Sequence, residues 1–348
     1  EDRVSEPIEI ADTPFKISGF AIDAEGELLV IDHSSPEGGF HYLRPRPSQT
    51  TNHQFPRTLS DSGLFTDVAT HRMQSAVIPY SVNSPLWSDN AHKARFIAMP
   101  GEDAKIDFHP TKSWGFPEGT VLVKSFGLEM VEGDPDSRRW IETRFFTKQQ
   151  GEWAGYSYAW NAEQTDARLV ESEGRDQEFN IRTSSGVRKQ PWRFPSRAEC
   201  MVCHSRAANF VLGVSTAQLN REHDYNGLQD NQLRTLEALG LFQHNPKSDL
   251  VAHFRELLVD AGQSEEQADA DLADVQATRD QRGAVTSASL LAKPPAAYDR
   301  LADPYNESLA LDARARSYLH VNCASCHINA GGGNAKIDLA YTRDQKGL

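Results

Sequence analysis

The feature that most constrains this chain is a five-residue motif, Cys-x-x-Cys-His, which occurs twice, at residues 200–204 (CMVCH) and 323–327 (CASCH). The two copies contain all four cysteines of the chain. Two thiols one helical turn apart can each form a bond to one edge of the same haem, and the following imidazole can then reach the iron from below. The motif therefore predicts two covalently attached c-type haems.

Each residue of the motif has a separate role in this prediction. Four residues are expected to form thioethers with the haem vinyl groups: Cys200, Cys203, Cys323 and Cys326. His204 and His327 are expected to be axial ligands of the two haem irons. Because haem is attached through thioethers in the periplasm or an equivalent compartment, we expect an exported protein.

Three other uses of paired cysteines were weighed. A zinc ribbon usually places roughly 15 to 20 residues between its two pairs, whereas Cys203 and Cys323 are 120 positions apart. A thioredoxin-like redox pair needs neither the histidine nor a second copy. Two disulfides within such short loops would contribute little stability. The haem interpretation explains the most residues.

Length and charge limit the class of protein. A chain of 348 residues predicts two or three domains, at about 100 to 200 residues each. The formal net charge of −13 disfavours nucleic acid and anionic membranes, and suits a basic redox partner. No apolar run reaches the roughly 18 to 20 residues that cross a bilayer, so we expect no transmembrane segment. The chain starts without Met or an apolar leader, so we expect a signal peptide that has either been removed or was never part of this sequence.

The first half of the chain predicts β-structure. Residues 1–50 are expected to form a β segment, with strands at Phe15–Ile22, Leu28–Ile31 and Phe40–Leu43. Residues 51–195 are expected to form an antiparallel β domain that resembles a sandwich. Its predicted strands are Gly119–Val131, Arg139–Thr147, Ala154–Trp160 and Ala167–Glu171. All six tryptophans lie in this stretch, either as core residues or as a binding platform.

The second half predicts helices, which makes the expected fold class α+β. Ser196 and Glu199 form a capping-box pattern just before the first motif. Residues 196–290 are expected to be a mainly helical region with the first haem, and 284–304 a linker. Residues 305–348 resemble the start of a class I cytochrome c domain with the second haem, and we expect this domain to be cut short in this chain. The helices expected in these regions are Asn231–Leu239, Asp249–Ala261, Ser264–Gln281 and Leu309–Val321.

Several further stretches resemble a poorly characterised family of exported dihaem c-type cytochromes. They are Val82–Asp89, Trp114–Lys124, Glu142–Arg144, Trp160–Ala167 and Phe194–Cys200. The resemblance implies an electron-transfer protein whose second motif belongs to a monohaem cytochrome c domain. Some members are fused to a quinoprotein β-propeller similar to sorbosone dehydrogenase, and the β segment looks like a last propeller blade. A dehydrogenase donor and a small cytochrome or oxidase acceptor are the partners this implies.

The distal ligands of the two irons do not follow from the sequence. A class I cytochrome c supplies a methionine some tens of residues after its motif, but only 21 residues follow His327 and none is Met. The second distal ligand therefore comes from elsewhere, lies beyond this chain or is absent. The candidates for the first haem are His223, His244, His253, Met73, Met99 and Met130.

Three functions were compared. We expect an electron carrier rather than an enzyme, because a carrier needs only its two haems. The alternative is a dihaem peroxidase-like enzyme or oxidase, in which one haem has an open site. Its distal polar groups would come from His92, Arg95, His109 and Glu142. In the third, the β domain binds a polysaccharide or a partner through exposed tryptophans.

Overall fold

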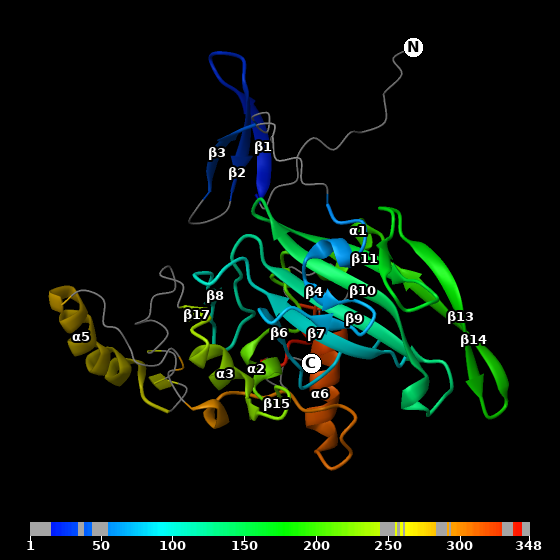
Figure 1. The fold of residues 1–348 in the computed structure, drawn as a ribbon. Coiled ribbons are helices and arrows are strands. Elements are labelled where there is room, and N and C mark those ends of the chain that lie inside the picture. The colour runs from blue at the N-terminus through cyan, green and yellow to red at the C-terminus, as the bar shows by residue number, and fades with distance from the viewer. Residues whose placement is uncertain are drawn as a thin grey trace. The chain divides into compact units, whose positions relative to one another are not determined.

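The computed structural model describes most of the chain. The described residues are 15–33, 38–43, 55–243, 255, 258–259, 262–282, 291, 294–328 and 337–342. They form two compact units, Glu1–Phe55 and Pro56–Leu348. Figure 1 labels the helices and strands.

The first unit is a small antiparallel sheet. Strand β1 (Ile17–Ile22) pairs with β2 (Leu28–Asp32), which pairs with β3 (Gly39–Tyr42). The turn between β1 and β2 is stabilised by Asp23, whose carboxylate accepts the backbone N–H groups of Glu25 and Glu27. The three strands lie where the sequence predicts them.

The second unit is built on one six-stranded antiparallel sheet in the order β12-β11-β10-β9-β7-β6. Its strands are β6 (Val77–Pro79), β7 (His92–Ala98), β9 (Val121–Glu129), β10 (Arg138–Gln149), β11 (Glu152–Trp160) and β12 (Ala167–Leu169). The hairpin between β10 and β11 turns at Gln150 and Gly151, which both have positive φ, as a two-residue turn of this hand requires. The four strands predicted for this domain are confirmed.

Short elements complete the unit. Strand β4 (Phe65–Asp67) pairs with β5 (Arg72–Met73), β8 (Ile106–Asp107) with β17 (Phe242–Gln243), β13 (Arg175–Thr183) with β14 (Gly186–Phe194), and β15 (Glu222–Asp224) with β16 (Gln229–Asn231). The helices are α1 (Arg197–Cys203), α2 (Thr216–Leu219), α3 (Gln232–Ala238), α5 (Glu265–Arg282) and α6 (Leu311–Asn322). The 3₁₀ turns are η1 (Ser60–Ser62), η2 (Pro135–Ser137) and η3 (Pro295–Ala297).

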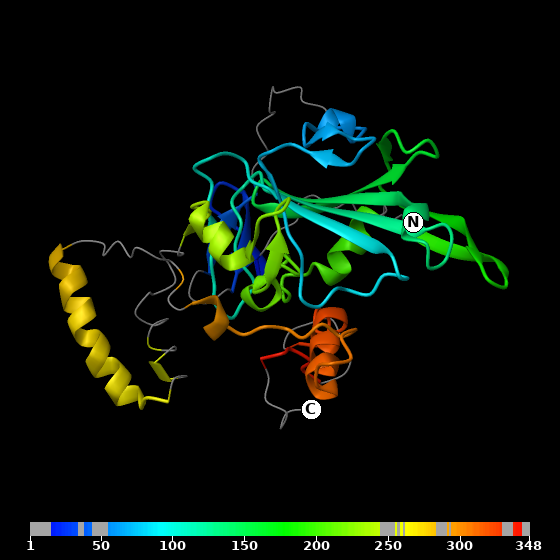
Figure 2. The same ribbon diagram turned by 60° about the horizontal axis from the view of Figure 1, so that its bottom comes forward.

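The two faces of the sheet are covered by different segments. On one face, Tyr158 is fully buried and its hydroxyl donates to the Pro56 carbonyl at 2.9 Å. On the opposite face, Leu122 and Phe146 pack in one core cluster with Leu219 of α2 and Leu233 of α3. Figure 2 shows η1 and β4 on one side of the sheet and α6 on the other.

The expected α+β class is wrong. Strands make up 35% of the structure and helices 19%. Among the described residues, the expected helical region at 196–290 contains the short helices α1, α2 and α3, which are interrupted by β15, β16 and β17, and the 18-residue α5. Helices α3, α5 and α6 match predicted helices closely. Most of Asp249–Ala261 lies outside the described residues, as do residues 284–290 and 292–293 of the expected linker.

The expected two-layer sandwich is replaced by a single sheet. The hairpin of β13 and β14 packs over one end of it, where Phe126 and Leu128 contact Ile181 and Trp192. This hairpin was not among the predicted strands.

The expected class I cytochrome c domain is also not found in the described residues. Helix α6 forms as predicted, but its apolar side chains do not make a core. Leu311 is 74% exposed, while the buried residue of the helix is Ser317. Because the buried residue of α6 is the small Ser317, the helix lies close to the rest of the second unit, where Ser84 hydrogen-bonds the Ser317 carbonyl. It does not form the apolar core of a separate helical domain.

The tryptophans are mainly core residues. Trp114, Trp160 and Trp192 are buried, and Trp153 packs against the main core cluster. Only Trp87, at 51%, is largely exposed. They do not form the exposed row that a binding platform would need.

Candidate functional site

A cavity of about 750 Å³ lies within the second unit. Its wall includes Lys124, Arg144 and Gly155 of the sheet, together with Cys200 and Cys203 of α1. Small-molecule and cofactor sites occupy roughly 300 to 1,000 Å³. The cavity is therefore large enough for a cofactor, and the first Cys-x-x-Cys-His motif lies on its wall.

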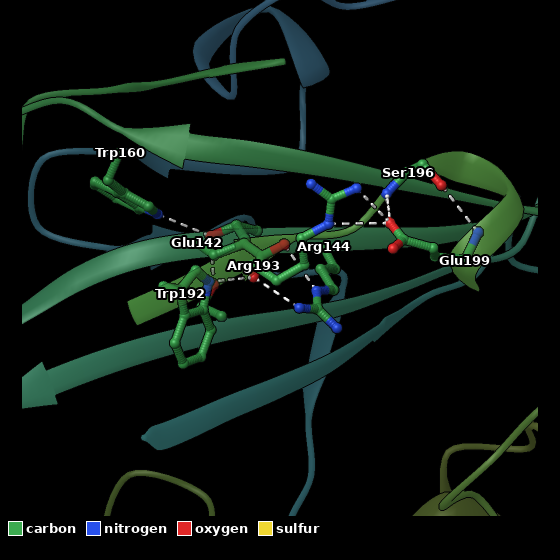
Figure 3. A network of polar contacts seen from close by, with 9 residues as sticks. Glu142, Arg144, Trp160, Trp192, Arg193, Ser196 and Glu199 are labelled. Carbon is green, nitrogen blue, oxygen red and sulfur yellow. Dashed lines mark hydrogen bonds and ion pairs between the residues drawn. The ribbon is translucent and has the colours of Figure 1, made fainter. Parts of the chain in front are cut away.

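The predicted capping box starts α1. The Ser196 hydroxyl accepts the backbone N–H of Glu199 at 3.1 Å, and the Glu199 carboxylate accepts the backbone N–H of Ser196 at 2.6 Å. Arg193 also donates to Glu199, at 2.9 Å (Figure 3). These contacts fix the first turn of a seven-residue helix, so that Cys200 and Cys203 follow one turn apart.

Helix α1 approaches β11 very closely at one point. A Cβ atom added to Gly155 would lie 2.6 Å from Cys200 Sγ and 2.7 Å from Cys200 Cβ. Such distances are not tolerated between carbon or sulfur atoms. Gly155 is therefore required for the helix to place Cys200 against the sheet.

A hydrogen bond to the His204 ring fixes the tautomer that can bind a metal through Nε2. Nδ1 lies 2.6 Å from the Phe210 carbonyl oxygen, and a carbonyl can only accept, so Nδ1 carries the proton and Nε2 keeps its lone pair. The ring also packs on Phe146, with centroids 4.1 Å apart. Burial lowers the pKa of His204 to about 4, the Phe210 hydrogen bond opposes the shift, and Lys124 and Arg144 add to it.

The two other histidines on the described cavity wall have the opposite tautomer. His109 Nδ1 accepts the backbone N–H groups of Thr111 and Lys112, at 3.2 and 3.0 Å. His320 Nδ1 accepts the backbone N–H of Tyr341 at 3.2 Å. Since a backbone N–H can only donate, the neutral rings of His109 and His320 carry their proton on Nε2. Only His204 is in the tautomer that can ligate iron through Nε2.

The second motif follows α6 in a tight turn. The backbone N–H of Cys326 and that of His327 both donate to the Cys323 carbonyl, at 3.1 and 2.9 Å. Its Cys323, Cys326 and His327 do not line the described cavity wall, although Ala324 and Ser325 between them do. His327 Nδ1 is buried and has no hydrogen-bond partner among the described residues, which would be costly without some ligand or solvent to compensate it.

The two motifs meet at the cavity. Ser325 hydrogen-bonds the Cys203 thiol and lies 4.0 Å from Cys326 Sγ. Burial and the neighbouring Cys326 raise the pKa of Cys203, and the Ser325 hydrogen bond lowers it. Two motifs separated by 120 positions in sequence are therefore in contact in the fold.

A short segment before β7 holds the two motif-bearing parts together. The Asn83 side-chain amide donates to the Ala217 carbonyl beside α2 at 2.9 Å. The Ser84 hydroxyl donates to the Ser317 carbonyl of α6 at 3.3 Å. The Trp87 backbone N–H donates to the Asn322 side chain at 2.8 Å, next to Cys323. The Asn83–Trp87 segment is therefore hydrogen-bonded to both α2 and α6.

The donor set fits haem better than the alternatives weighed from the sequence. All four cysteines are free thiols, which leaves each able to form a thioether. Within the described ranges, no group of three or more His, Cys, Asp or Glu side chains is arranged to hold a metal ion directly. Cys200, Cys203 and His204 together offer two thiols and one imidazole lone pair at a cofactor-sized cavity.

The distal-ligand candidates are not found at this cavity. His223 Nδ1 hydrogen-bonds Ser81 at 2.7 Å, Met99 packs against the main core cluster and Met130 packs under the β13–β14 hairpin. Met73 lies on β5, and none of these four is on the described cavity wall. His244 and His253 lie outside the described residues.

A row of positive charge lines the cavity and was only partly anticipated. Arg95 on β7, Lys124 on β9 and Arg144 on β10 are direct cross-strand neighbours. Glu142 is fully buried and accepts two hydrogen bonds from Arg144, both at 2.8 Å, and one from Trp192 at 2.9 Å (Figure 3). Burial lowers the pKa of Lys124 well below its usual range, and Arg95, Arg144 and Lys93 lower it further.

Of the polar groups named for an enzyme, Arg95 and His109 line the cavity. Glu142 is already bonded to Arg144, and His92 lies beside Trp140 in a separate pocket. The sequence analysis missed Lys124. A charged residue inside the otherwise apolar run Val121–Val123 and Phe126 was the available signal.

Comparison with protein-family models, curated proteins and solved structures gave no match. Among the described residues, no helix is both long and apolar enough to span a bilayer.

Proposed function

We propose that this chain carries two covalently bound haems c and transfers electrons between redox proteins outside the cytoplasm. The observation that carries the proposal is His204, whose tautomer leaves an imidazole lone pair beside Cys200 and Cys203 at a cofactor-sized cavity. Cys323, Cys326 and His327 form the second set.

Attachment uses the residues as follows. Each thiol would add across one vinyl group of the haem, so that one C–S bond would form and the thiol hydrogen would pass to the other vinyl carbon, with no net oxidation. His204 and His327 would hold the two irons, and the Phe210 carbonyl orients the His204 ring. When bound, haem supplies one-electron chemistry, while the protein sets its potential through ligands and burial.

Transfer between the two groups is supported by the contact of the two motifs. Ser325 touches the Cys203 thiol, so that groups attached to the two motifs would have neighbouring edges. The close packing of Ser317 and Asn322 against the Ser84–Trp87 segment would hold this spacing. A dehydrogenase donor and a small cytochrome or oxidase acceptor are the proposed partners, and the net charge of −13 favours a basic one.

A second candidate function is a dihaem peroxidase-like enzyme or oxidase. It is favoured by the presence of both Arg95 and His109 on the cavity wall. The neutral His109 ring donates through Nε2, as derived above. Arg95 and His109 could therefore donate hydrogen bonds to a molecule bound on the open side of an iron.

Spectroscopy separates the two functions. Optical and low-temperature EPR spectra would be recorded for the oxidised and reduced protein, with and without carbon monoxide and peroxide. Two low-spin haems that do not react with carbon monoxide support the electron carrier. A high-spin haem that binds carbon monoxide and reacts with peroxide would favour the enzyme instead.

A further inference from the structure

Three basic side chains form a straight row across the sheet. Arg95 pairs with Lys124, Lys124 pairs with Arg144, and Arg144 pairs with Ser157. Residues that are direct cross-strand partners point to the same face, and all three basic residues line the cavity. Like charges directly opposite one another destabilise a sheet, so this arrangement needs a compensating anion.

Only one end of the row has a carboxylate partner. Arg144 is paired with Glu142. Among the described residues, no ion pair or side-chain hydrogen bond is formed by Arg95 or Lys124. Burial lowers the pKa of Arg95 and the nearby Arg221 lowers it further, with Tyr80 opposing the shift. Two partly buried cations therefore face the cavity, and no carboxylate of the described residues is paired with either of them.

The position of the two cations relative to Cys200 indicates what they bind. Helix α1 lies over β11, where Cys200 touches Gly155. Because neighbouring strands are about 4.8 Å apart, Lys124 on β9 and Arg95 on β7 lie about two and three strand spacings from β11. They are therefore at the far side of the cavity from the thiols.

We propose that Lys124 and Arg95 bind the propionate carboxylates of the haem attached at Cys200 and Cys203. The inference rests on the proposed function, because it requires a haem at the first motif. Cysteine thioethers hold one edge of the haem, and its carboxylates extend from the opposite edge toward the two cations. The ion pairs compensate the cation row and keep the propionates ionised.

The test is the pH dependence of the midpoint potential of the first haem in the full-length holoprotein. Its signal is identified by comparison with a Cys200→Ala/Cys203→Ala variant. The variants are Lys124→Met and Arg95→Gln, with Lys124→Arg as the charge-conserving form. Lys93→Gln is the matched control, because Lys93 is on the same strand and face as Arg95 but is not on the described cavity wall.

The wild type and Lys124→Arg should show a flat potential between about pH 6 and 8. In Lys124→Met and Arg95→Gln, an unpaired propionate has a raised pKa. The potential should then be lower than wild type at pH 8 and rise as the pH falls. Lys93→Gln should keep the flat profile.

Three results would overturn the proposal. The first is a midpoint potential that stays flat with pH in Lys124→Met and Arg95→Gln, and the second is a pH-dependent potential in the control Lys93→Gln; either would mean that the cations affect the haem only as distant charges. The third is a saturable shift of the wild-type potential on adding succinate, which would mean that the site takes a free carboxylate ligand. Failure of the proposed function is seen separately, as wild-type protein without covalent haem.

Discussion

Replacing Glu142 by glutamine tests the charge balance of the cavity wall. Glu142 is fully buried, and its two oxygens accept hydrogen bonds from Arg144 and Trp192. Glutamine keeps the shape and one acceptor but removes the negative charge. Arg144 would then lose its protein carboxylate and become an uncompensated cation in the row.

The expected loss of stability follows from the burial of the Glu142–Arg144 ion pair. Removing one partner of a buried ion pair typically costs about 3 to 5 kcal/mol. The Arg144 side chain is 33% exposed, so water in the cavity can solvate part of its charge. We therefore expect Glu142→Gln to lower the free energy of unfolding by about 3 kcal/mol. This is a large share of the roughly 5 to 15 kcal/mol that stabilises a domain.

Urea denaturation of the holoprotein, followed by circular dichroism, measures this cost. Glu178→Gln is the matched control, because Glu178 pairs with Lys189 at 2.9 Å on an exposed surface, where little change is expected. The double variant Glu142→Gln/Arg144→Met should recover much of the loss, since no unpaired charge remains. If Glu142→Gln were no less stable than Glu178→Gln, the cation row would not depend on Glu142 and the reasoning would be refuted.

Three further changes test other parts of the structure. Burial lowers the pKa of His71 to about 4, so the unfolded chain binds the proton first, and this residue should contribute a loss of up to about 3 kcal/mol as the pH drops from about 6.5 to 4. In urea denaturation at each pH, His71→Asn should lose less stability than the wild type over this range by about that amount, and equal losses would contradict the burial of His71. Gly155→Ala should cost about 1 to 3 kcal/mol and reduce haem content by displacing Cys200, whereas Gly101→Ala, where an added Cβ meets nothing within 4 Å, should leave both unchanged; equal behaviour would contradict the close approach. Ser196→Ala should cost about 1 kcal/mol in thermal unfolding, and an unchanged melting temperature would argue against the capping box.

Local signals in the sequence were sufficient for the strands of the central sheet and for the start of α1. Alternating apolar residues bounded by turn residues gave the four predicted strands, and the Ser196–Glu199 pattern gave the capping box. The β13–β14 hairpin was not predicted because polar residues dominate its sequence. Its buried apolar side chains are Ile181, Trp192 and Phe194, and the buried Gln190 between them interrupts the apolar pattern of β14.

Features that depend on long-range packing could not be predicted. The spacing of Leu311, Ala315 and Leu319 is helical, but it does not reveal that Ser317 is the buried residue of α6. The row of Arg95, Lys124 and Arg144 exists only once the strand register is known. The contact between the two Cys-x-x-Cys-His motifs likewise depends on the Asn83–Trp87 segment, which is hydrogen-bonded to both α2 and α6.

The account depends most directly on covalent haem at both motifs. The protein would be produced behind an added export signal in a host with a c-type haem maturation system. Pyridine haemochrome spectra and intact-protein mass would then be measured for the wild type and for variants with both cysteines of one motif changed to alanine. We predict two haems per chain in the wild type, and one in Cys200→Ala/Cys203→Ala and in Cys323→Ala/Cys326→Ala. A wild-type mass without haem, or haem that is lost in acidified organic solvent, would contradict the account.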